Sequence, residues 1–241
     1  MKPTVGLFIR FGYEIRIAGL RKTYRVAAQE FTALNGLNCL IPAARMTVVE
    51  GPSGCGKTTL MNIVGAVDFA DGGSITVGSH DLGPERNEQK LARYRLTEIG
   101  FVFQAFNLIP GLSALDNIQL PMAVLGRPRA ERAERAHALL GLMDMDKKAM
   151  KRPDELSGGE QQRVAIALAL ANDPPVILAD EPTGNLDSAN AAIVTALLYS
   201  LANDFGKTVV VCTHDDSVGR RGDQRIKMRD GEVLEVATSR A

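Results

Sequence analysis

The chain has 241 residues, of which 45% are hydrophobic and 23% are charged, and this suits one globular domain or one domain with a subdomain. Its 28 Lys and Arg residues balance 28 Asp and Glu residues, so it lacks the basic excess of a dedicated nucleic-acid binder. The three scattered cysteines form no CxxC pair, support neither a zinc site nor a disulfide framework, and favour a reducing compartment.

The chain also lacks a segment that would place it in a membrane by itself. No apolar run approaches the roughly 20 residues that span a bilayer. Charged residues interrupt the apolar N-terminal segment, which makes it a poor signal peptide. We therefore expect a cytoplasmic protein whose role at a membrane comes through partners.

The first hundred residues read mainly as short strands. Asn35-Gly36 is expected to interrupt one of them, and Pro42 to end it. A compact strand leads straight into a glycine-rich loop, and residues 60–67 continue as a helix. The predicted strands are residues 14–17, 33–41, 46–50, 74–77 and 99–103.

The second half begins with a helical insertion between about residues 116 and 152. Residues 130–142 are predicted to be a helix, with Glu131 and Arg135 at the spacing of an ion pair along it. Short apolar runs then follow, typical of parallel strands covered on both faces. A hairpin with a turn at Gly231 ends the chain. The predicted strands are residues 176–179 and 208–213, and the hairpin covers 225–236.

Residues 51–58 match the phosphate-binding pattern G-x-x-x-x-G-K-T between a predicted strand and a predicted helix. Glycines let consecutive backbone N–H groups turn toward phosphate oxygens, and the helix directs its positive end at them. Lys57 supplies a mobile charge for the β- and γ-phosphates, and Thr58 offers a hydroxyl to Mg²⁺. The predicted nucleotide-binding loop comprises Gly51, Pro52, Ser53, Gly54, Cys55, Gly56, Lys57, Thr58 and Thr59.

The apolar strand 176–179 ends in two adjacent carboxylates, Asp180 and Glu181. In a parallel sheet, ligands gather beyond the carboxyl ends of the strands, where the glycine-rich loop also lies. Asp180 is therefore placed to hold Mg²⁺, and Glu181 to polarise an attacking water as a general base. The loop upstream disfavours the alternative of a solvated strand end.

Ser157, Gly158 and Gly159 open another predicted helix, residues 160–171. A serine and two glycines at this place make a second helix N-terminus that can bind an anion. One nucleotide does not need two such sites from one chain. Two chains facing head to tail would set the second site of each against the γ-phosphate held by the other, which predicts a homodimer on nucleotide binding.

The segment Leu-Ser-Gly-Gly-Glu-Gln at 156–161 resembles the signature of the ABC ATPase family, and the resemblance covers nearly the whole chain. It implies an α/β P-loop fold with a mainly parallel core sheet, an antiparallel β subdomain and an α-helical signature subdomain. We expect a single ABC ATPase domain over residues 1–241, with the helical subdomain inserted at about 105–172. The resemblance also implies ATP and Mg²⁺ as cofactors and ATP hydrolysis as the reaction.

The same resemblance assigns roles to single residues. Gln104 matches the glutamine that touches Mg²⁺ and relays the nucleotide state to a membrane subunit, and Asp187 matches the aspartate that couples the two sites. His214 matches the histidine that contacts the γ-phosphate. Tyr24 is similar to the aromatic residue that stacks on adenine, although other aromatic residues lie near it in sequence. The implied roles are catalysis for Lys57, Gln104, Glu181 and His214, Mg²⁺ binding for Thr58, Gln104 and Asp180, and nucleotide contact for Ser157, Gly158, Gly159 and Glu160.

Residues 101–110 and 179–187 resemble the subfamily of lipoprotein-release, macrolide-export and cell-division ATPases. This implies a transmembrane permease partner with a large extracytoplasmic domain, and a peripheral place at the cytoplasmic face of the plasma membrane. The output would be exporter-like or mechanical work, and the cargo stays open. Phe106, Leu108 and Ile109 are candidates either for contact with that partner or for the core of the helical subdomain.

Two other functions compete with transport. A nucleotide-dependent regulator of a membrane protein would keep the same catalytic residues. A soluble ABC protein that acts on nucleic acid or the ribosome is disfavoured, because the interval between Lys57 and Ser157 has no room for a long coiled-coil insertion. The balanced charge points the same way, so we expect no nucleic-acid partner.

Overall fold

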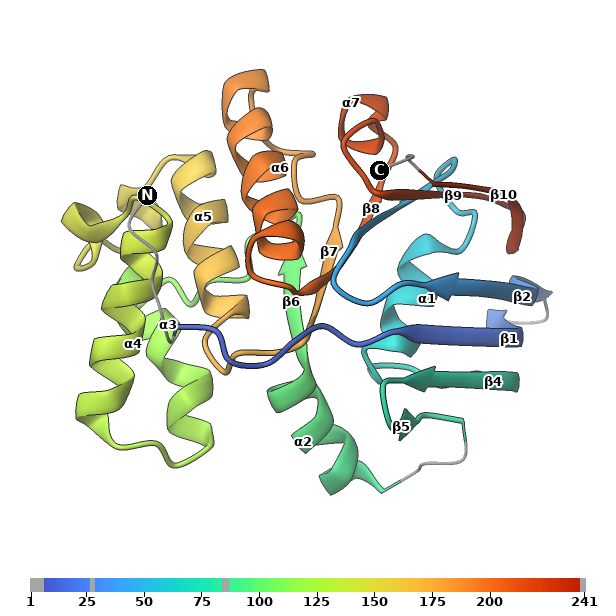
Figure 1. Cartoon of the computed structure of the whole chain (residues 1–241), viewed down its shortest axis with the longest axis horizontal. Coiled ribbons are helices and arrows are strands. Elements are labelled where there is room, and N and C mark those ends of the chain that lie inside the picture. The colour runs from blue at the N-terminus through green and yellow to red at the C-terminus, as the bar shows by residue number, and fades with distance from the viewer. Residues whose placement is uncertain (1–6, 27–28, 84–86, 239–241) are drawn as a thin grey trace.

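The computed structural model describes residues 7–26, 29–83 and 87–238. A six-stranded sheet in the order β10-β9-β3-β8-β7-β6 lies beside a four-stranded sheet in the order β2-β1-β4-β5 (Figure 1). Helices α3, α4 and α5 form a lobe on the other side of the six-stranded sheet. The strands are β1 (Ile15–Val26), β2 (Gln29–Ile41), β3 (Met46–Glu50), β4 (Gly72–Val77), β5 (His80–Asp81), β6 (Ile99–Phe103), β7 (Val176–Asp180), β8 (Thr208–Thr213), β9 (Gln224–Arg229) and β10 (Glu232–Thr238). The helices are α1 (Lys57–Val64), α2 (Glu88–Glu98), α3 (Ala114–Val124), α4 (Arg129–Leu142), α5 (Gly158–Ala169), α6 (Ser188–Asn203) and α7 (Asp216–Gly219).

The six-stranded sheet is parallel except at its β10 edge, and the four-stranded sheet is antiparallel. Every residue of β3 and β8 is buried, because helices or the second sheet cover both faces of these strands. The continuous apolar runs in the sequence have the same cause. The expected mainly parallel α/β fold is confirmed, and the strands expected at 46–50, 99–103 and 208–213 have the predicted bounds.

The two N-terminal strands are longer than the sequence indicates. Strand β1 continues to residue 26 and β2 begins at residue 29, whereas strands were expected only at 14–17 and 33–41. The prediction that Asn35-Gly36 interrupts the strand was wrong. Gly36 is instead the extra residue of a β-bulge, and its φ of 70° is one that glycine adopts without strain.

Helix α4 begins one residue before its predicted start. The predicted ion pair between Glu131 and Arg135 along this helix was wrong. The guanidinium of Arg135 donates hydrogen bonds to the backbone oxygens of Leu7, Leu170 and Ala171, at 2.6, 3.0 and 2.5 Å. Two of these carbonyls belong to the C-cap of α5, Leu170, and to the residue after it. Satisfying them is favoured over an exposed pair along α4.

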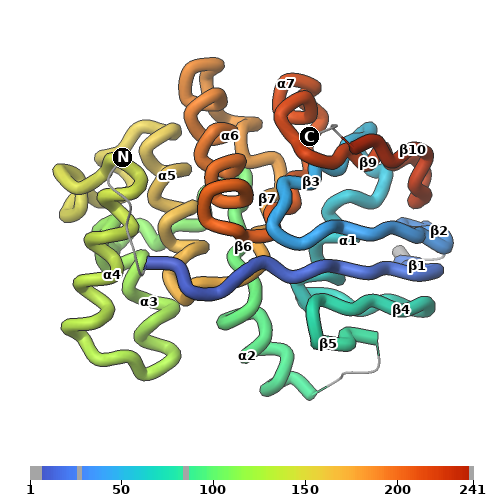
Figure 2. The backbone as a smooth tube through the Cα atoms, in the orientation of Figure 1, coloured from blue at the N-terminus to red at the C-terminus, as the bar shows by residue number. Residues whose placement is uncertain are grey.

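The segment 7–13 crosses from the helical lobe to the start of β1 (Figure 2). Its backbone is held by Asp173, whose Oδ2 accepts hydrogen bonds from the N–H groups of Ile9 and Arg10 at 3.0 and 3.1 Å. The other oxygen of Asp173 accepts a 2.5 Å bond from Lys207, which is fully buried. Asp173 therefore links this segment to Lys207, because it bonds the backbone of the segment and forms a buried ion pair with Lys207.

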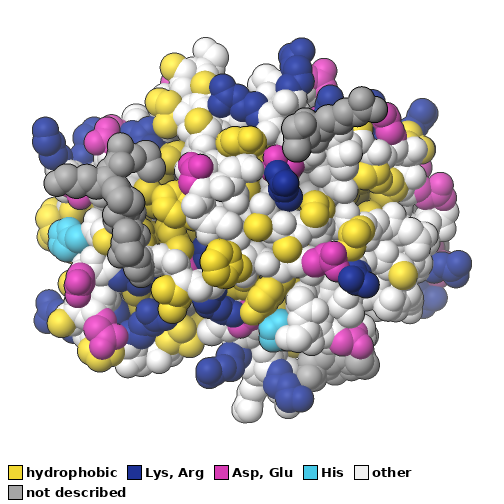
Figure 3. Space-filling model, viewed as in Figure 1, with side chains coloured by type: hydrophobic (Ala, Val, Ile, Leu, Met, Phe, Trp, Pro, Cys, Tyr) yellow, Lys and Arg dark blue, Asp and Glu magenta, His cyan; other side chains and the backbone are white. Residues whose placement is uncertain are grey.

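Among the residues that the structure describes, no helix is long and apolar enough to cross a membrane. On the face seen in Figure 3, basic and acidic side chains alternate without a large region of one sign. This agrees with the balanced composition of the chain.

Candidate active site

The glycine-rich loop between β3 and α1 has the shape of an anion-binding helix N-terminus. Gly54 and Gly56 have φ values of 81° and 104°. A Cβ on Gly56 would lie 2.4 Å from the backbone oxygen of Ala33, so only glycine fits there. Gly56 is also the N-cap of α1, and no described side chain caps this helix. The first N–H groups of α1 therefore point into the loop, where they can donate to phosphate.

Lys57 is buried inside this loop. Its Nζ donates to the backbone oxygens of Gly51 at 2.7 Å and Pro52 at 3.1 Å. The Sγ of Cys55 lies 3.9 Å from the same Nζ, and Cys55 is only 3% exposed. The loop thus places one positive charge at the N-terminus of α1, and its thiol is shielded from solvent.

Thr58 and Asp180 form the part of the site that suits a metal. Thr58 Oγ1 donates to Asp180 Oδ2 at 2.9 Å, while Asp180 Oδ1 is buried and has no hydrogen-bond partner among the described residues. Burial raises the pKa of Asp180, although the bond from Thr58 opposes the shift. A buried carboxylate oxygen without a donor is costly unless a cation meets it. These two residues therefore fit a Mg²⁺ site.

The described part of the chain does not surround such an ion with a cluster of carboxylates, imidazoles or thiols. Within the described ranges, no group of three or more His, Cys, Asp and Glu side chains could hold a metal. Mg²⁺ usually keeps several waters and binds one or two carboxylates together with substrate phosphates. The Thr58–Asp180 pair has this sparse character.

Glu181 adopts a left-handed backbone conformation, with a φ of 46°, which is strained for a residue with a side chain. Its N–H donates to the backbone oxygen of Cys212 at 2.9 Å. Its carboxylate accepts a bond from Thr213 Oγ1 at 3.2 Å and lies 2.9 Å from His214 Nδ1. The side chains of Glu181 and His214 are thus held against each other at the ends of β7 and β8.

Gln104 follows β6 and is joined to the segment that precedes α6. Its Nε2 donates to Asn185 Oδ1 at 3.2 Å, and Asn185 Nδ2 donates to the backbone oxygen of Gln104 at 3.0 Å. A Cβ on Gly184 would lie 2.7 Å from Gln104 Nε2, so glycine permits this approach. Asn185 was not among the site residues predicted from the sequence, although it lies in the segment 179–187 on which the subfamily resemblance rests.

These elements open into one hollow of about 440 Å³, within the size range of small-molecule sites. His214 lines a neighbouring hollow of about 410 Å³ and contacts the first through Glu181. The structure therefore brings together the expected loop, metal and base residues. The first hollow is lined by Ser53, Gly54, Lys57, Thr58, Phe103, Gln104, Ala105, Asn107, Asp180 and Glu181.

The signature residues do not line this hollow. Ser157 is the N-cap of α5, and its Oγ accepts a bond from the N–H of Glu160 at 3.4 Å. Glu160 in turn accepts a bond from the N–H of Ser157 at 2.9 Å and pairs with Lys148. The bonds from Lys148 and from the Ser157 N–H lower the pKa of Glu160. Within one chain, the second helix N-terminus is thus separate from the first.

Asp187 is the N-cap of α6, and it accepts bonds from the backbone N–H and the side-chain Nδ2 of Asn190, at 2.9 and 2.7 Å. These bonds lower the pKa of Asp187. Asn190 also packs directly on the signature, because a Cβ on Gly159 would lie 2.1 Å from its Oδ1. Asn190, which was not predicted from the sequence, therefore connects Asp187 to the signature helix.

Tyr24 lies on β1 and does not line the hollow. Its hydroxyl donates to Asp68 Oδ2 at 2.7 Å, and the Nζ of Lys22 lies 4.9 Å from the centroid of its ring. Phe31 is paired opposite Tyr24 on β2 and is 54% exposed. Tyr24, unlike Phe31, is therefore tied to the segment that follows α1.

A hollow of about 240 Å³ lies between β6, α2 and the helical lobe. Phe106 lines it and has a φ of 60°, Leu108 packs against the lobe core, and Ile109 is 43% exposed. Phe103 and Asn107 line both this hollow and the one at the P-loop. The two hollows therefore share part of their walls.

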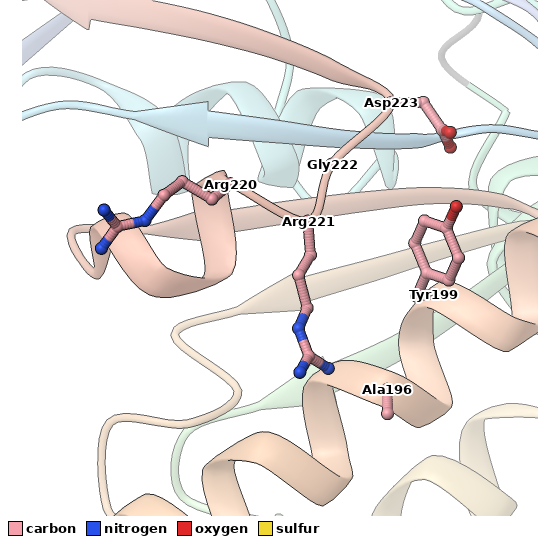
Figure 4. Close-up of a pocket in the computed structure, with 6 residues that line it drawn as sticks. All are labelled: Ala196, Tyr199, Arg220, Arg221, Gly222 and Asp223. Atoms are coloured by element: carbon pink, nitrogen blue, oxygen red, sulfur yellow. The ribbon is translucent and has the colours of Figure 1, made fainter. Parts of the chain in front are cut away.

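Another hollow, of about 450 Å³, lies between α6 and the turn after α7 (Figure 4). Arg221 extends from this turn toward Ala196 on α6, and Arg220 points away from it. Asp223 is already bonded to the N–H of Met46 at 2.8 Å. This hollow shares no lining residue with the P-loop hollow, so the expected chemistry is not located there.

Residues 34–184 match the family model described as "ABC transporter". The chain is 43% identical over 226 residues to MJ0796 of Methanocaldococcus jannaschii, described as an uncharacterized ABC transporter ATP-binding protein, with 91% of this chain and 94% of that protein covered. It is 40% identical to the lipoprotein-releasing system ATP-binding protein LolD of Bacteroides fragilis, with 91% and 100% covered. It is 43% identical to the macrolide export ATP-binding/permease protein MacB of Rhodopirellula baltica, but spans only 33% of that protein.

Solved structures place the chain in the same family. A dimeric, post-hydrolysis structure of MJ0796 bound to ADP and Pi superimposes with a TM-score of 0.86 at 40% identity, covering 94% of this chain and 99% of that one. A second dimeric structure of MJ0796 has the same TM-score at 41% identity and the same coverage. Over 94% of its length the chain therefore has the fold of these cassettes.

Proposed function

The chain belongs to the ABC transporter family as an ATP-binding, ATP-hydrolysing subunit of the LolD/MacB type, and from that premise we propose that two copies hydrolyse Mg-ATP to drive an exporter-like or mechanically acting membrane complex. The observation that carries this proposal is the meeting of Lys57, Asp180 and Glu181 at one hollow. A phosphate-binding charge, a metal-binding carboxylate and a base are the groups that phosphoryl transfer to water needs.

Phosphate binding is the work of the loop and α1. The uncapped N–H groups of α1 and the ammonium of Lys57 would hold the β- and γ-phosphates. Thr58 and Asp180 would hold Mg²⁺, and Gln104, which lines the same hollow, would touch it. When bound, the ion would neutralise charge on the phosphate oxygens. Tyr24 would stack on the adenine.

Glu181 would act as the general base. Thr213 and His214 fix its carboxylate, which supports its role in orienting a water and accepting its proton. His214 would in turn contact the γ-phosphate.

The second phosphate contact would come from another copy. The signature residues lie on the helical subdomain, about residues 105–172, away from the P-loop hollow of the same chain. In a head-to-tail dimer, Ser157, Gly158 and Gly159 of each chain would face the nucleotide of the other, and Asp187 would couple the two sites. The dimeric structures of MJ0796 support the pairing of two chains.

The membrane partner would dock in the hollow between α2, β6 and the lobe. Phe106 would be its contact, since it lines that hollow, and the shared wall at Phe103 and Asn107 would transmit the nucleotide state. We propose that the partner is a permease with a large extracytoplasmic domain. The chain would bind it from the cytoplasmic face. Its similarity to LolD and to part of MacB supports this class of partner.

The test is to identify what binds the chain in its ATP-bound state. A tagged Glu181→Gln variant, which should bind ATP but hydrolyse it poorly, is extracted with mild detergent, and Phe106→Asp in the same background is the control. We expect a membrane protein with a large external domain in stoichiometric amount, lost in the control. Recovery of a soluble dimer alone, or of ribosomes or DNA, would keep the ATPase and remove the membrane role.

A further inference from the structure

Three side chains meet beside the segment that follows α1. Tyr24 Oη donates to Asp68 Oδ2 at 2.7 Å, and Lys22 Nζ donates to Asp68 Oδ1 at 2.8 Å. Lys22, a buried residue, also donates to the backbone oxygen of Phe69 at 2.8 Å. Its ammonium lies 4.9 Å from the centroid of the Tyr24 ring, close enough for a cation–π interaction.

Lys22 and Tyr24 stabilise the ionised carboxylate of Asp68. Partial burial alone would raise the pKa of Asp68, but the bonds from Lys22, Tyr24 and the Phe69 N–H outweigh burial and lower the pKa. For Tyr24, burial and the bond to Asp68 raise the pKa, so the phenol donates at neutral pH. The contact between Tyr24 and Asp68 is therefore a charge-assisted hydrogen bond, which is stronger than a neutral one.

The backbone of the same region is held as well. The N–H of Thr23 donates to Asp71 Oδ2 at 2.6 Å, and the N–H of Asp71 donates to the backbone oxygen of Arg21 at 2.8 Å. Asp68 comes four residues after Val64, the last residue of α1. Hydrogen bonds thus connect the segment that follows α1 to the part of β1 that carries the aromatic ring.

A tyrosine on a strand would otherwise exchange among staggered rotamers. Here the hydroxyl is bonded at the far end of the ring, and the ammonium lies over one face of it. A flat ligand can stack only on the other face. Because the ring is ordered beforehand, binding does not incur the entropy cost of immobilising it.

We propose that Asp68 and Lys22 are positioning residues that hold the Tyr24 ring as a rigid platform for the nucleobase. This rests on the proposed function, in which Tyr24 stacks on adenine. The pair would touch neither the phosphates nor the reacting water. Its contribution should therefore be confined to ligands that carry a base.

The experiment compares Mg-ADP with magnesium tripolyphosphate, which has phosphates but no base, by calorimetric titration of the full chain. Asp68→Ala should weaken ADP about threefold to tenfold, the cost of immobilising one side chain on binding, and leave tripolyphosphate unchanged. Tyr24→Phe keeps the ring and should give the same pattern even if Asp68→Ala does not fold. The double variant should be no weaker than either single one, and Asp68→Asn, which keeps an acceptor, should restore part of the affinity.

The matched control is Tyr94→Phe. Its hydroxyl donates to the backbone oxygen of Val64 at 2.9 Å, so it supports the same helix without facing the proposed base, and ADP affinity should not change. Equal weakening of both ligands by Asp68→Ala, or of neither, would overturn the positioning role. If Tyr24→Ala weakens ADP while Asp68→Ala and Tyr24→Phe do not, only this inference fails. If Tyr24→Ala leaves ADP binding intact, the adenine contact of the proposed function is itself wrong.

Discussion

The N-termini of α1 and α5 carry the two glycine-containing segments expected to bind phosphate, and they differ in what satisfies their first N–H groups. Gly56 begins α1 without a side-chain cap, and Lys57 adds a positive charge beside it. At α5, Ser157 and Glu160 form a reciprocal capping box, and Lys148 pairs with Glu160. The first N-terminus is therefore open to an anion, whereas at the second a side chain already accepts the N–H of Glu160.

This difference fits a site shared between two chains. An open N-terminus can bind phosphate by itself, but a capped one contributes only when a phosphate competes for its donors. The bond from the Glu160 N–H to Ser157 Oγ is 3.4 Å, at the weak end of hydrogen bonding. In the proposed dimer, this hydroxyl and N–H would turn to the nucleotide of the other chain.

The largest expected effect on activity comes from a substitution at the N-terminus of α1. Lys57→Ala removes the charge at the phosphate loop, so ATP binding should be lost, and hydrolysis should fall about 100-fold to 1,000-fold, as for other preorganised electrostatic contacts. Titration and phosphate release measure the two effects. Lys148→Ala, at the capped end, should leave binding of ATP to a single chain unchanged. Unchanged ATP affinity in Lys57→Ala would remove Lys57 from its assigned role.

At the capped end, Ser157→Arg should abolish hydrolysis by the dimer while each chain still binds one nucleotide. The arginine would fill the space that the other chain's γ-phosphate needs. In the Glu181→Gln background, light scattering should show an ATP-dependent dimer that Ser157→Arg prevents. Ser79→Arg, at an exposed turn, should leave the dimer intact. Loss of nucleotide binding in the Ser157→Arg monomer would contradict the shared site.

Alanine substitutions at Gly56 and Gly158 should also distinguish the two helix N-termini, through a smaller effect on stability. Gly56→Ala puts a Cβ 2.4 Å from a backbone oxygen at a φ of 104°, so we expect a loss of about 1–3 kcal/mol in the free energy of unfolding. At Gly158, the nearest atoms would be 3.7 Å away, an ordinary contact. Gly158→Ala should therefore change stability little. Urea unfolding measures the free energy of unfolding of both variants. Equal losses of stability at Gly56 and Gly158 would be inconsistent with the described loop.

The smallest effect concerns the charge of Glu160. Its bonds to Lys148 and the Ser157 N–H lower its pKa, so its stabilisation is present above the ordinary pKa and is lost as the pH falls through the lowered one. Glu160→Gln keeps the capping box but removes the charge. The two proteins should differ slightly in thermal midpoint at pH 7 and converge once the pH falls below the lowered pKa of Glu160. A difference that grows in acid would show that the ion pair is not its source.

The sequence alone determined the features whose cause is local. The glycine-rich loop follows from adjacent residues, and the buried strands at 46–50, 99–103 and 208–213 follow from continuous apolar runs. Asp180 and Glu181 could be placed beside the loop, because the carboxyl ends of parallel strands meet at one edge of the sheet. The long strand β1, with its mixed polar pattern and bulges, was recognised only in part.

Only the tertiary structure decided which distant side chains meet. Gln104 bonds Asn185 across 81 positions, and Tyr24 bonds Asp68 across 44. Arg135 donates to carbonyls at the end of α5 and in the N-terminal segment, not to the glutamate one turn away on its own helix. No local pattern encodes such partners, because a polar side chain bonds whatever donor or acceptor the packing of helices and sheets brings within 3 Å or so.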